Sequence, residues 1–184
     1  MTDLSLDTTV DELVRRNGEF AEARDVAGLT MLPTGRTIIV GCVDPRVDPT
    51  AVLGLELGEA AVIRNIGGRI TPAAQRTLAL LGAIARTGGT QPGPGWNLVV
   101  IHHTDCGIVR LLDQPVGLAA ELGTSPDALD PDSIIDPRAS LAVDLATLRA
   151  NPLLPPGLIV SGLLYDTESG RIETVVAPSV LGAQ

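Results

Sequence analysis

The stretch "RTIIVGCVDPRVDP", residues 36–49, decides the fold, because an apolar run passes directly into a cluster of reactive side chains. Its "TIIV" segment is continuously apolar rather than alternating, which is typical of a strand buried on both faces of a parallel sheet. Similar runs are "AAVIRNI" (60–66), "NLVVIHH" (97–103) and "GLIVSGLLYD" (157–166). Helical patterns at 49–57, 71–86 and 135–151 separate these runs. The alternation predicts an α/β fold.

The central sheet is expected to be mostly parallel, with about four parallel strands flanked by helices. The tail "LLYDTESGRIETVVA" (163–177) predicts a hairpin that adds an antiparallel strand at one edge. Residues 9–27 carry an apolar helical face that Gly18 weakens, so either one helix or two short helices can form there. We expect one domain over residues 1–184, with residues 1–30 as an N-terminal helical arm. Residues 88–96 are expected to form a Gly/Pro loop, and residues 114–133 to mix a short helix with Pro- and Asp-rich turns.

The composition excludes several classes of function. A net charge of −9 without a basic run argues against nucleic-acid binding. All 13 basic residues are arginine, which excludes a Schiff-base lysine and a phosphate-loop lysine. No G-x-G-x-x-G motif follows a strand, so a dinucleotide site is not indicated. The acidic start "MTDLSLDTTVDEL" predicts no signal peptide, and the apolar runs are shorter than the ~20 residues of a membrane helix. We therefore expect a cytoplasmic protein with reduced cysteines.

Both cysteines and both histidines of the chain follow two of the predicted strands. The first strand ends in Cys42, Asp44 and Arg46, and the third ends in the stretch "HHTDCG" (102–107). Ligands of open α/β sheets bind beyond the carboxyl ends of the strands, which lie at one edge. The reactive side chains are therefore expected to meet at that edge.

Two thiolates and one imidazole are the ligand set of a catalytic zinc with an open fourth position. Cys42, His103 and Cys106 supply these groups, and the H-x-x-C spacing lets one turn carry two of them. In an extended chain Cys42, Asp44 and Arg46 would share one face. Arg46 can then hold Asp44 off the metal, where it accepts a hydrogen bond from a zinc-bound hydroxide. Each residue alone would more often be a core cysteine or an ordinary ion pair; their coincidence favours the metal site.

Ile66, Gly67 and Gly68 are the candidates for the substrate pocket. The glycine pair would let the backbone approach a small ligand closely, and a tight structural turn is the alternative. His102 is expected to be structural or exposed, because only His103 has the short spacing to Cys106.

These motifs resemble those of the β-class carbonic anhydrases. "CVDPRV" (42–47) is similar to the family's C-x-D-S-R signature, "HTDCG" (103–107) to its H-x-x-C-G, and "VIRNIGG" (62–68) to its R-N-A-G segment. The resemblance implies Zn²⁺ bound by Cys42, His103 and Cys106, with Asp44 and Arg46 as the catalytic dyad. Pro45 departs from the pattern, since it stands where the family has serine.

The resemblance also implies an activity and an assembly. The activity would be reversible hydration of carbon dioxide to bicarbonate by attack of a zinc-bound hydroxide. The assembly would be a homodimer or a dimer of dimers, without nucleic-acid or membrane partners. Two alternatives stay open: hydrolysis of carbonyl sulfide or carbon disulfide on the same scaffold, and a non-catalytic zinc or redox module whose site Asp44 closes.

Overall fold

The computed structural model describes residues 6–182, and these fall into two compact units that divide after Met31. The first unit contains helix α1, Leu6–Ala23. This helix runs through Gly18 without a break, so the alternative of two short helices is wrong. Ion pairs from Glu12 to Arg15 and Arg16, at helical spacing, offset the low helix propensity of glycine. That the two units form a single domain stays a prediction.

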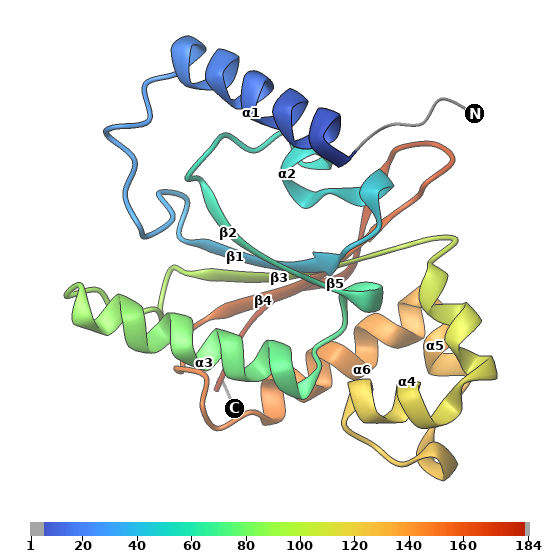
Figure 1. Cartoon of the computed structure of the whole chain (residues 1–184). Helices are drawn as coiled ribbons and strands as arrows, with labels where there is room; N and C mark the ends of the chain where they lie inside the picture. Colours follow the sequence, from blue (N-terminus) through green and yellow to red (C-terminus); the bar gives the residue numbers. More distant parts are fainter. Residues whose placement is uncertain (1–5, 183–184) are drawn as a thin grey trace. The chain divides into compact units, whose positions relative to one another are not determined.

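The second unit is built on a five-stranded sheet of order β2-β1-β3-β4-β5 (Figure 1). The strands β1 to β4 are parallel, and β5 pairs with β4 in the antiparallel direction, which confirms the predicted sheet. The strand bounds are Thr37–Cys42 (β1), Ala60–Asn65 (β2), Asn97–His103 (β3), Ile159–Tyr165 (β4) and Ile172–Val180 (β5).

Two long helices, α3 (Pro72–Thr87) and α6 (Pro137–Ala150), cover one face of the sheet, as Figure 1 shows. Alternate residues of the strands point to this face and join the helices in one aliphatic core. That core includes Ile38, Val40, Leu98, Val100, Val160, Leu78, Leu141, Leu145 and Leu148. On the opposite face, Gly41 leaves room for Pro49 of α2, because a Cβ atom there would lie 2.9 Å from its ring.

The helix predicted at 49–57 is wrong in length, because α2 covers only Pro49–Val52. Asp48 caps its start by accepting bonds from the N–H groups of Thr50 and Ala51. The chain then reaches Gly54 with φ of +64°, a left-handed conformation that ends the helix. The short helix expected within residues 114–133 is present as α4, Pro115–Leu122. Further short helical segments flank it: Gly107–Asp113 (η3), Pro126–Ala128 (η4) and Asp132–Ile135 (α5).

The sheet topology brings the predicted site residues to one edge. Strand β1 lies between β2 and β3, and all three run in the same direction. Cys42 ends β1 opposite Asn65 of β2, and the last residues of β3 are His102 and His103. Within residues 6–182, no helix combines the length and the apolar character that a membrane crossing requires.

Candidate metal centre

Three side chains at the carboxyl edge form a compact group of metal-binding donors. Cys42, His103 and Cys106 each offer one ligand atom, and these atoms lie within 4.8 Å of one another. The two sulfur atoms are 3.8 Å apart. Cys42 comes from the end of β1, while His103 and Cys106 come from the end of β3 and the turn that follows it. The predicted ligands therefore meet as the topology requires.

The orientation of His103 fits a metal ligand. Its Nδ1 lies 2.8 Å from the carbonyl oxygen of Thr104, so this nitrogen carries the proton and donates. Its Nε2 is buried and finds no hydrogen-bond partner among residues 6–182. Burial of an unpartnered nitrogen is unfavourable, and a backbone carbonyl on the other ring nitrogen is the usual support of a ligating histidine. The donor set of two sulfurs and one imidazole therefore fits a thiophilic metal such as zinc.

Asp44 is held beside this group by Arg46. The arginine Nε lies 3.1 Å from one carboxylate oxygen, and its Nη2 lies 2.8 Å from the other, a two-pronged contact. The shared face of an extended chain is the wrong explanation, because residues Pro45–Val47 form a 3₁₀ turn. Asp44 caps this turn by accepting the Arg46 N–H at 2.9 Å. Its carboxylate thus binds the arginine and, within the described residues, stands outside the group of three donors.

The two glycines let the backbone pack tightly behind Cys42. Gly68 has φ of +67°, and a Cβ atom there would lie 2.9 Å from the Cys42 backbone nitrogen. Gly67 has φ of +75°, and a Cβ atom there would lie 2.6 Å from the Ile108 side chain. Ile66 is 43% exposed. The close backbone approach thus serves Cys42 itself, and the role of Ile66, Gly67 and Gly68 in substrate binding stays a prediction.

Comparison with known proteins decides the family. A family profile described as "Carbonic anhydrase" matches residues 37–130. The β-carbonic anhydrase 1 of Mycobacterium tuberculosis is 30% identical over 174 residues, which cover 91% of this chain and 98% of that protein. The chain belongs to the β-carbonic anhydrase family. The crystal structure of a carbonic anhydrase from Streptococcus mutans is similar, with a TM-score of 0.70 and 31% identity over 90% of this chain and 96% of that one.

Another relative carries a different name. The carbon disulfide hydrolase of Saccharolobus solfataricus is 26% identical over 189 residues, covering 89% of this chain and 87% of that protein. Membership of the β-carbonic anhydrase family supports an enzyme with a lyase-type reaction. Membership of the family does not by itself identify the substrate, which depends on the chemistry of the site.

When no metal is bound, the pKa values of the two thiols of this β-carbonic anhydrase site are shifted in opposite directions. The Cys106 thiol donates to Cys42, and together with the N–H groups of Asp44 and Gly67 this lowers the pKa of Cys42 to about 4. The same contact with Cys42, together with burial, raises the pKa of Cys106. Burial lowers the pKa of His103, but the nearby Cys42 sulfur and the Thr104 carbonyl oxygen outweigh this effect and raise it overall. Of the two thiols, Cys42 is therefore the more acidic when no metal is bound.

This difference predicts the ultraviolet titration of the metal-free protein. A thiol with a lowered pKa is ionised above that pKa, so one thiolate per chain should form with a midpoint near pH 4 and remain through pH 8. The second thiolate should not form below pH 9, since the pKa of Cys106 is raised. Thiolate absorbance measured against pH tests this. The Cys42→Ser variant should lack the acidic step, and two steps near the usual range of ~8.5 would contradict the expectation.

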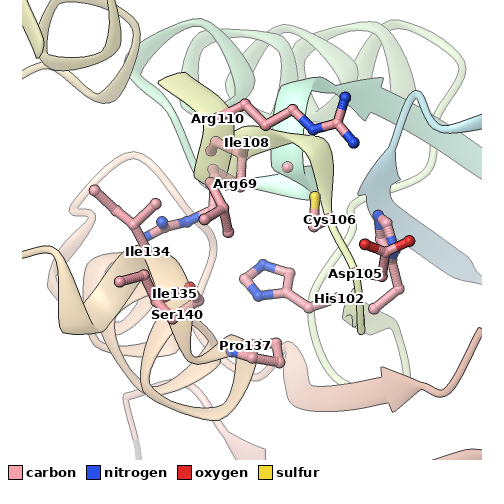
Figure 2. Close-up of a pocket in the computed structure, with 13 residues that line it drawn as sticks. Arg69, His102, Asp105, Cys106, Ile108, Arg110, Ile134, Ile135, Pro137 and Ser140 are labelled. Atoms are coloured by element: carbon pink, nitrogen blue, oxygen red, sulfur yellow. The ribbon is translucent and has the colours of Figure 1, made fainter. Parts of the chain in front are cut away.

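Two pockets lie on either side of the turn that carries Cys106. The first, here the Asp44 pocket, has a volume of about 310 Å³ and is lined by Asp44, Arg46, Asp105, Cys106, Gly107 and Arg110. The second, here the His102 pocket, also has about 310 Å³. Figure 2 shows the ring of His102 reaching into it, with Arg69, Ile134 and Ser140 around it. The first pocket is mostly polar, whereas isoleucines and a proline form much of the second.

Two further residues contact this site, and of these Asp105 was not singled out by sequence reasoning. Asp105 has φ of +53° and accepts a bond from Arg46 Nη1 at 2.8 Å, so the arginine binds two carboxylates. Arg64 donates to the carbonyl oxygens of Cys42 and Asp44, both at 2.8 Å. It thereby fixes the backbone between the metal donor and the acidic residue. The position of Asp105 inside the H-x-x-C turn was a usable signal, whereas the contacts of Arg64 arise only once β1 and β2 pair.

Proposed function

We propose that the protein is a zinc-dependent carbonic anhydrase that hydrates carbon dioxide to bicarbonate reversibly. One observation carries this proposal: three soft donors converge at a single point while Arg46 holds an ionised carboxylate, Asp44, beside them. A structural zinc site usually has four protein ligands, whereas a catalytic site keeps one position open. The comparisons support the family, and the ligand set supports zinc as its metal.

Cys42, His103 and Cys106 would hold the metal. A bound zinc ion would supply a Lewis acid that lowers the pKa of water, though less than at a three-histidine site, because two thiolates neutralise its charge. Arg46 lowers the pKa of Asp44 to about 2, so this carboxylate stays ionised and can only accept hydrogen bonds. Asp44 would therefore accept a hydrogen bond from the attacking water molecule and direct its lone pair at the substrate carbon. Addition of the water oxygen to carbon dioxide gives bicarbonate and releases one proton to the buffer.

Stopped-flow hydration of carbon dioxide, normalised to bound zinc, tests the proposal. We expect fast turnover that rises between pH 7 and pH 8.5, because the weaker Lewis acid leaves water protonated at the lower pH. A zinc-free sample is the control and should hydrate carbon dioxide no faster than buffer. Absence of turnover at both pH values, with about one zinc per chain, would refute carbon dioxide as the substrate.

Carbonyl sulfide or carbon disulfide is the second candidate substrate. The curated relatives that are named carbon disulfide hydrolases support it, since one of them matches 89% of this chain. These molecules, like carbon dioxide, are linear, apolar and electrophilic at carbon, so the same donors and the same carboxylate would serve. Sulfide release measured on the same zinc-loaded sample separates the candidates. A kcat/KM for either sulfur substrate above that for carbon dioxide would favour the hydrolase. We do not propose the non-catalytic module, because the family supports an enzyme.

Self-association into a homodimer or a dimer of dimers is part of the proposal. Neighbouring folds include β-carbonic anhydrases of Sordaria macrospora that are described as tetrameric, although at 20% identity they share only the fold. Helix α1 carries Val10, Leu13 and Val14 at helical spacing, each more than half exposed. Such a stripe suits packing against another helix or chain. A cytoplasmic location stays a prediction.

A further inference from the structure

A buried ion pair lies behind the metal donors, at the far side of the His102 pocket. Arg69 Nε donates to a carboxylate oxygen of Asp144 at 2.8 Å, and the two side chains are 5% and 4% exposed. The same carboxylate oxygen lies 3.0 Å from Nε2 of His102, which is 3% exposed. Asp144 belongs to α6, Arg69 follows the glycine pair, and His102 ends β3. One carboxylate of a distant helix thus contacts both the turn that packs behind Cys42 and the strand end that carries His103.

The first of these connections leads to Cys42. The side chain of Arg69 folds back over Gly67, and its Cγ would lie 3.3 Å from a Cβ atom at that position. The backbone of Arg69 is fixed as well, because its N–H and its carbonyl oxygen both bind the side-chain amide of Asn65, at 2.8 and 2.7 Å. Gly67 and Gly68 are held between them, and a Cβ atom at Gly68 would lie 2.9 Å from the Cys42 backbone nitrogen. Anchoring Arg69 therefore fixes the turn that packs behind Cys42.

The second connection leads to His103. His102 and His103 are the last two residues of β3, and their backbones pair with Leu164 and Tyr165 of β4. The His102 ring lies against Asp144 of α6 at 3.0 Å without a hydrogen bond from its Nε2, so close packing rather than a directed bond holds this strand end against the helix. Because His103 follows directly, this packing limits the freedom of the strand end from which the turn to Cys106 begins. Asp144 thus contacts both the support of Cys42 and the strand end of His103.

The energetics of buried ion pairs argue against a purely stabilising role. Removing an arginine and a carboxylate from water is costly, and replacing such a pair by apolar residues of similar volume is often neutral or stabilising. Only loss of one partner is strongly destabilising. The pair therefore adds little stability beyond what apolar side chains of the same volume would give. Apolar side chains could not, however, replace the directed hydrogen bond between Arg69 and Asp144.

We propose that Asp144, acting through Arg69 and His102, is a positioning residue that holds the metal donors in binding geometry. This inference rests on the proposed zinc site. Partners of metal ligands that lie outside the ligand set typically contribute about 10- to 100-fold in metal affinity. Asp144 would act one step further away, through the backbone that supports Cys42 and the strand end that carries His103.

The test measures zinc affinity and thermal stability together. Wild-type holoenzyme and its variants are titrated with a chromogenic zinc chelator at constant pH, and the melting temperature of each is recorded. The variants are Asp144→Asn and the double variant Arg69→Met/Asp144→Leu, which removes both charges at similar volume. Leu141→Ala is the matched control, since Leu141 lies on α6, three residues earlier, and is fully buried in the aliphatic core.

Because Asp144 acts one step beyond such partners, we expect both Asp144 variants to raise the Kd for zinc about 10-fold, the lower end of that range. Leu141→Ala should lower the melting temperature and leave the Kd within about twofold, because a cavity in the core does not reach the donor turn. A folded double variant that binds zinc like the wild type would overturn the inference. So would failure of both Asp144 variants to fold, because the pair would then serve the fold itself. A wild type that binds no zinc would instead refute the proposed function.

Discussion

The Cys106→Ser variant is expected to lose zinc binding, with an affinity about a hundred- to a thousandfold below that of the wild type. Structural zinc sites with four protein ligands bind with roughly 10–16 kcal/mol, or about 2.5–4 kcal/mol for each ligand. A serine hydroxyl is a poor replacement for a thiolate, because it stays protonated near neutral pH and is a harder donor. Hydration activity should disappear together with the metal.

Zinc content after dialysis and chelator titration measure this loss. The chain offers no third cysteine as a control, so the matched substitution is Ser161→Ala, which also exchanges a small buried group but on β4. That variant should retain zinc. If Cys106→Ser kept one zinc per chain at wild-type affinity, the assignment of the donor set would be wrong.

The Asp44→Asn variant is expected to keep its zinc and to lose turnover, with kcat/KM lowered roughly 10²- to 10⁴-fold. Asp44 is not one of the three donors, so its substitution leaves the metal ligands in place. An asparagine presents an N–H₂ group where the carboxylate offered only acceptors, and Arg46 would orient the amide oxygen toward itself. The hydrogen bond that directs the attacking water would then be lost or reversed.

The pH profile makes this prediction sharper. Because the pKa of Asp44 is held at about 2, its protonation cannot cause any loss of activity between pH 5 and pH 8. The wild type and Asp44→Asn should therefore differ by the same factor throughout that range. Glu173→Gln is the matched control, since Glu173 is also paired with an arginine, Arg138, but lies on β5. Its activity should stay within about twofold, as surface ion pairs contribute little. A difference that vanishes toward pH 5 would contradict the role given to Asp44.

The sheet and the donor group could be predicted from the sequence because they depend on local patterns. Continuous apolar runs define buried parallel strands, and parallel strands bring their carboxyl ends together, so Cys42 and Cys106 had to approach each other. The end of α2 was predicted too late because the left-handed backbone at Gly54 outweighed an apolar pattern that continued through Leu57. Local signals were sufficient for the position of these elements but not for their exact length.

The contacts around the donors could not be predicted, because they join residues far apart in the chain. Arg69 and Asp144 are 75 positions apart, and neither has a pattern that distinguishes it from a surface charge. His102 was expected to be structural or exposed, and only the packing of α6 shows that it is buried beside Asp144. The relation between Asp44 and Arg46 was predicted correctly as a pair, although a 3₁₀ turn rather than an extended strand brings them together.

The position of the donors on neighbouring central strands has a consequence for folding. Cys42 and Cys106 are 64 positions apart along the chain, so an ion bound by both would cross-link β1 to the end of β3 and close a long loop. In the unfolded chain the two donors could share an ion only by closing this long loop, so the ion would bind the folded chain far more tightly than the unfolded one. The unfolding midpoint would therefore rise with the concentration of free metal. The supply of metal would then determine the stability of the protein as well as its rate of turnover.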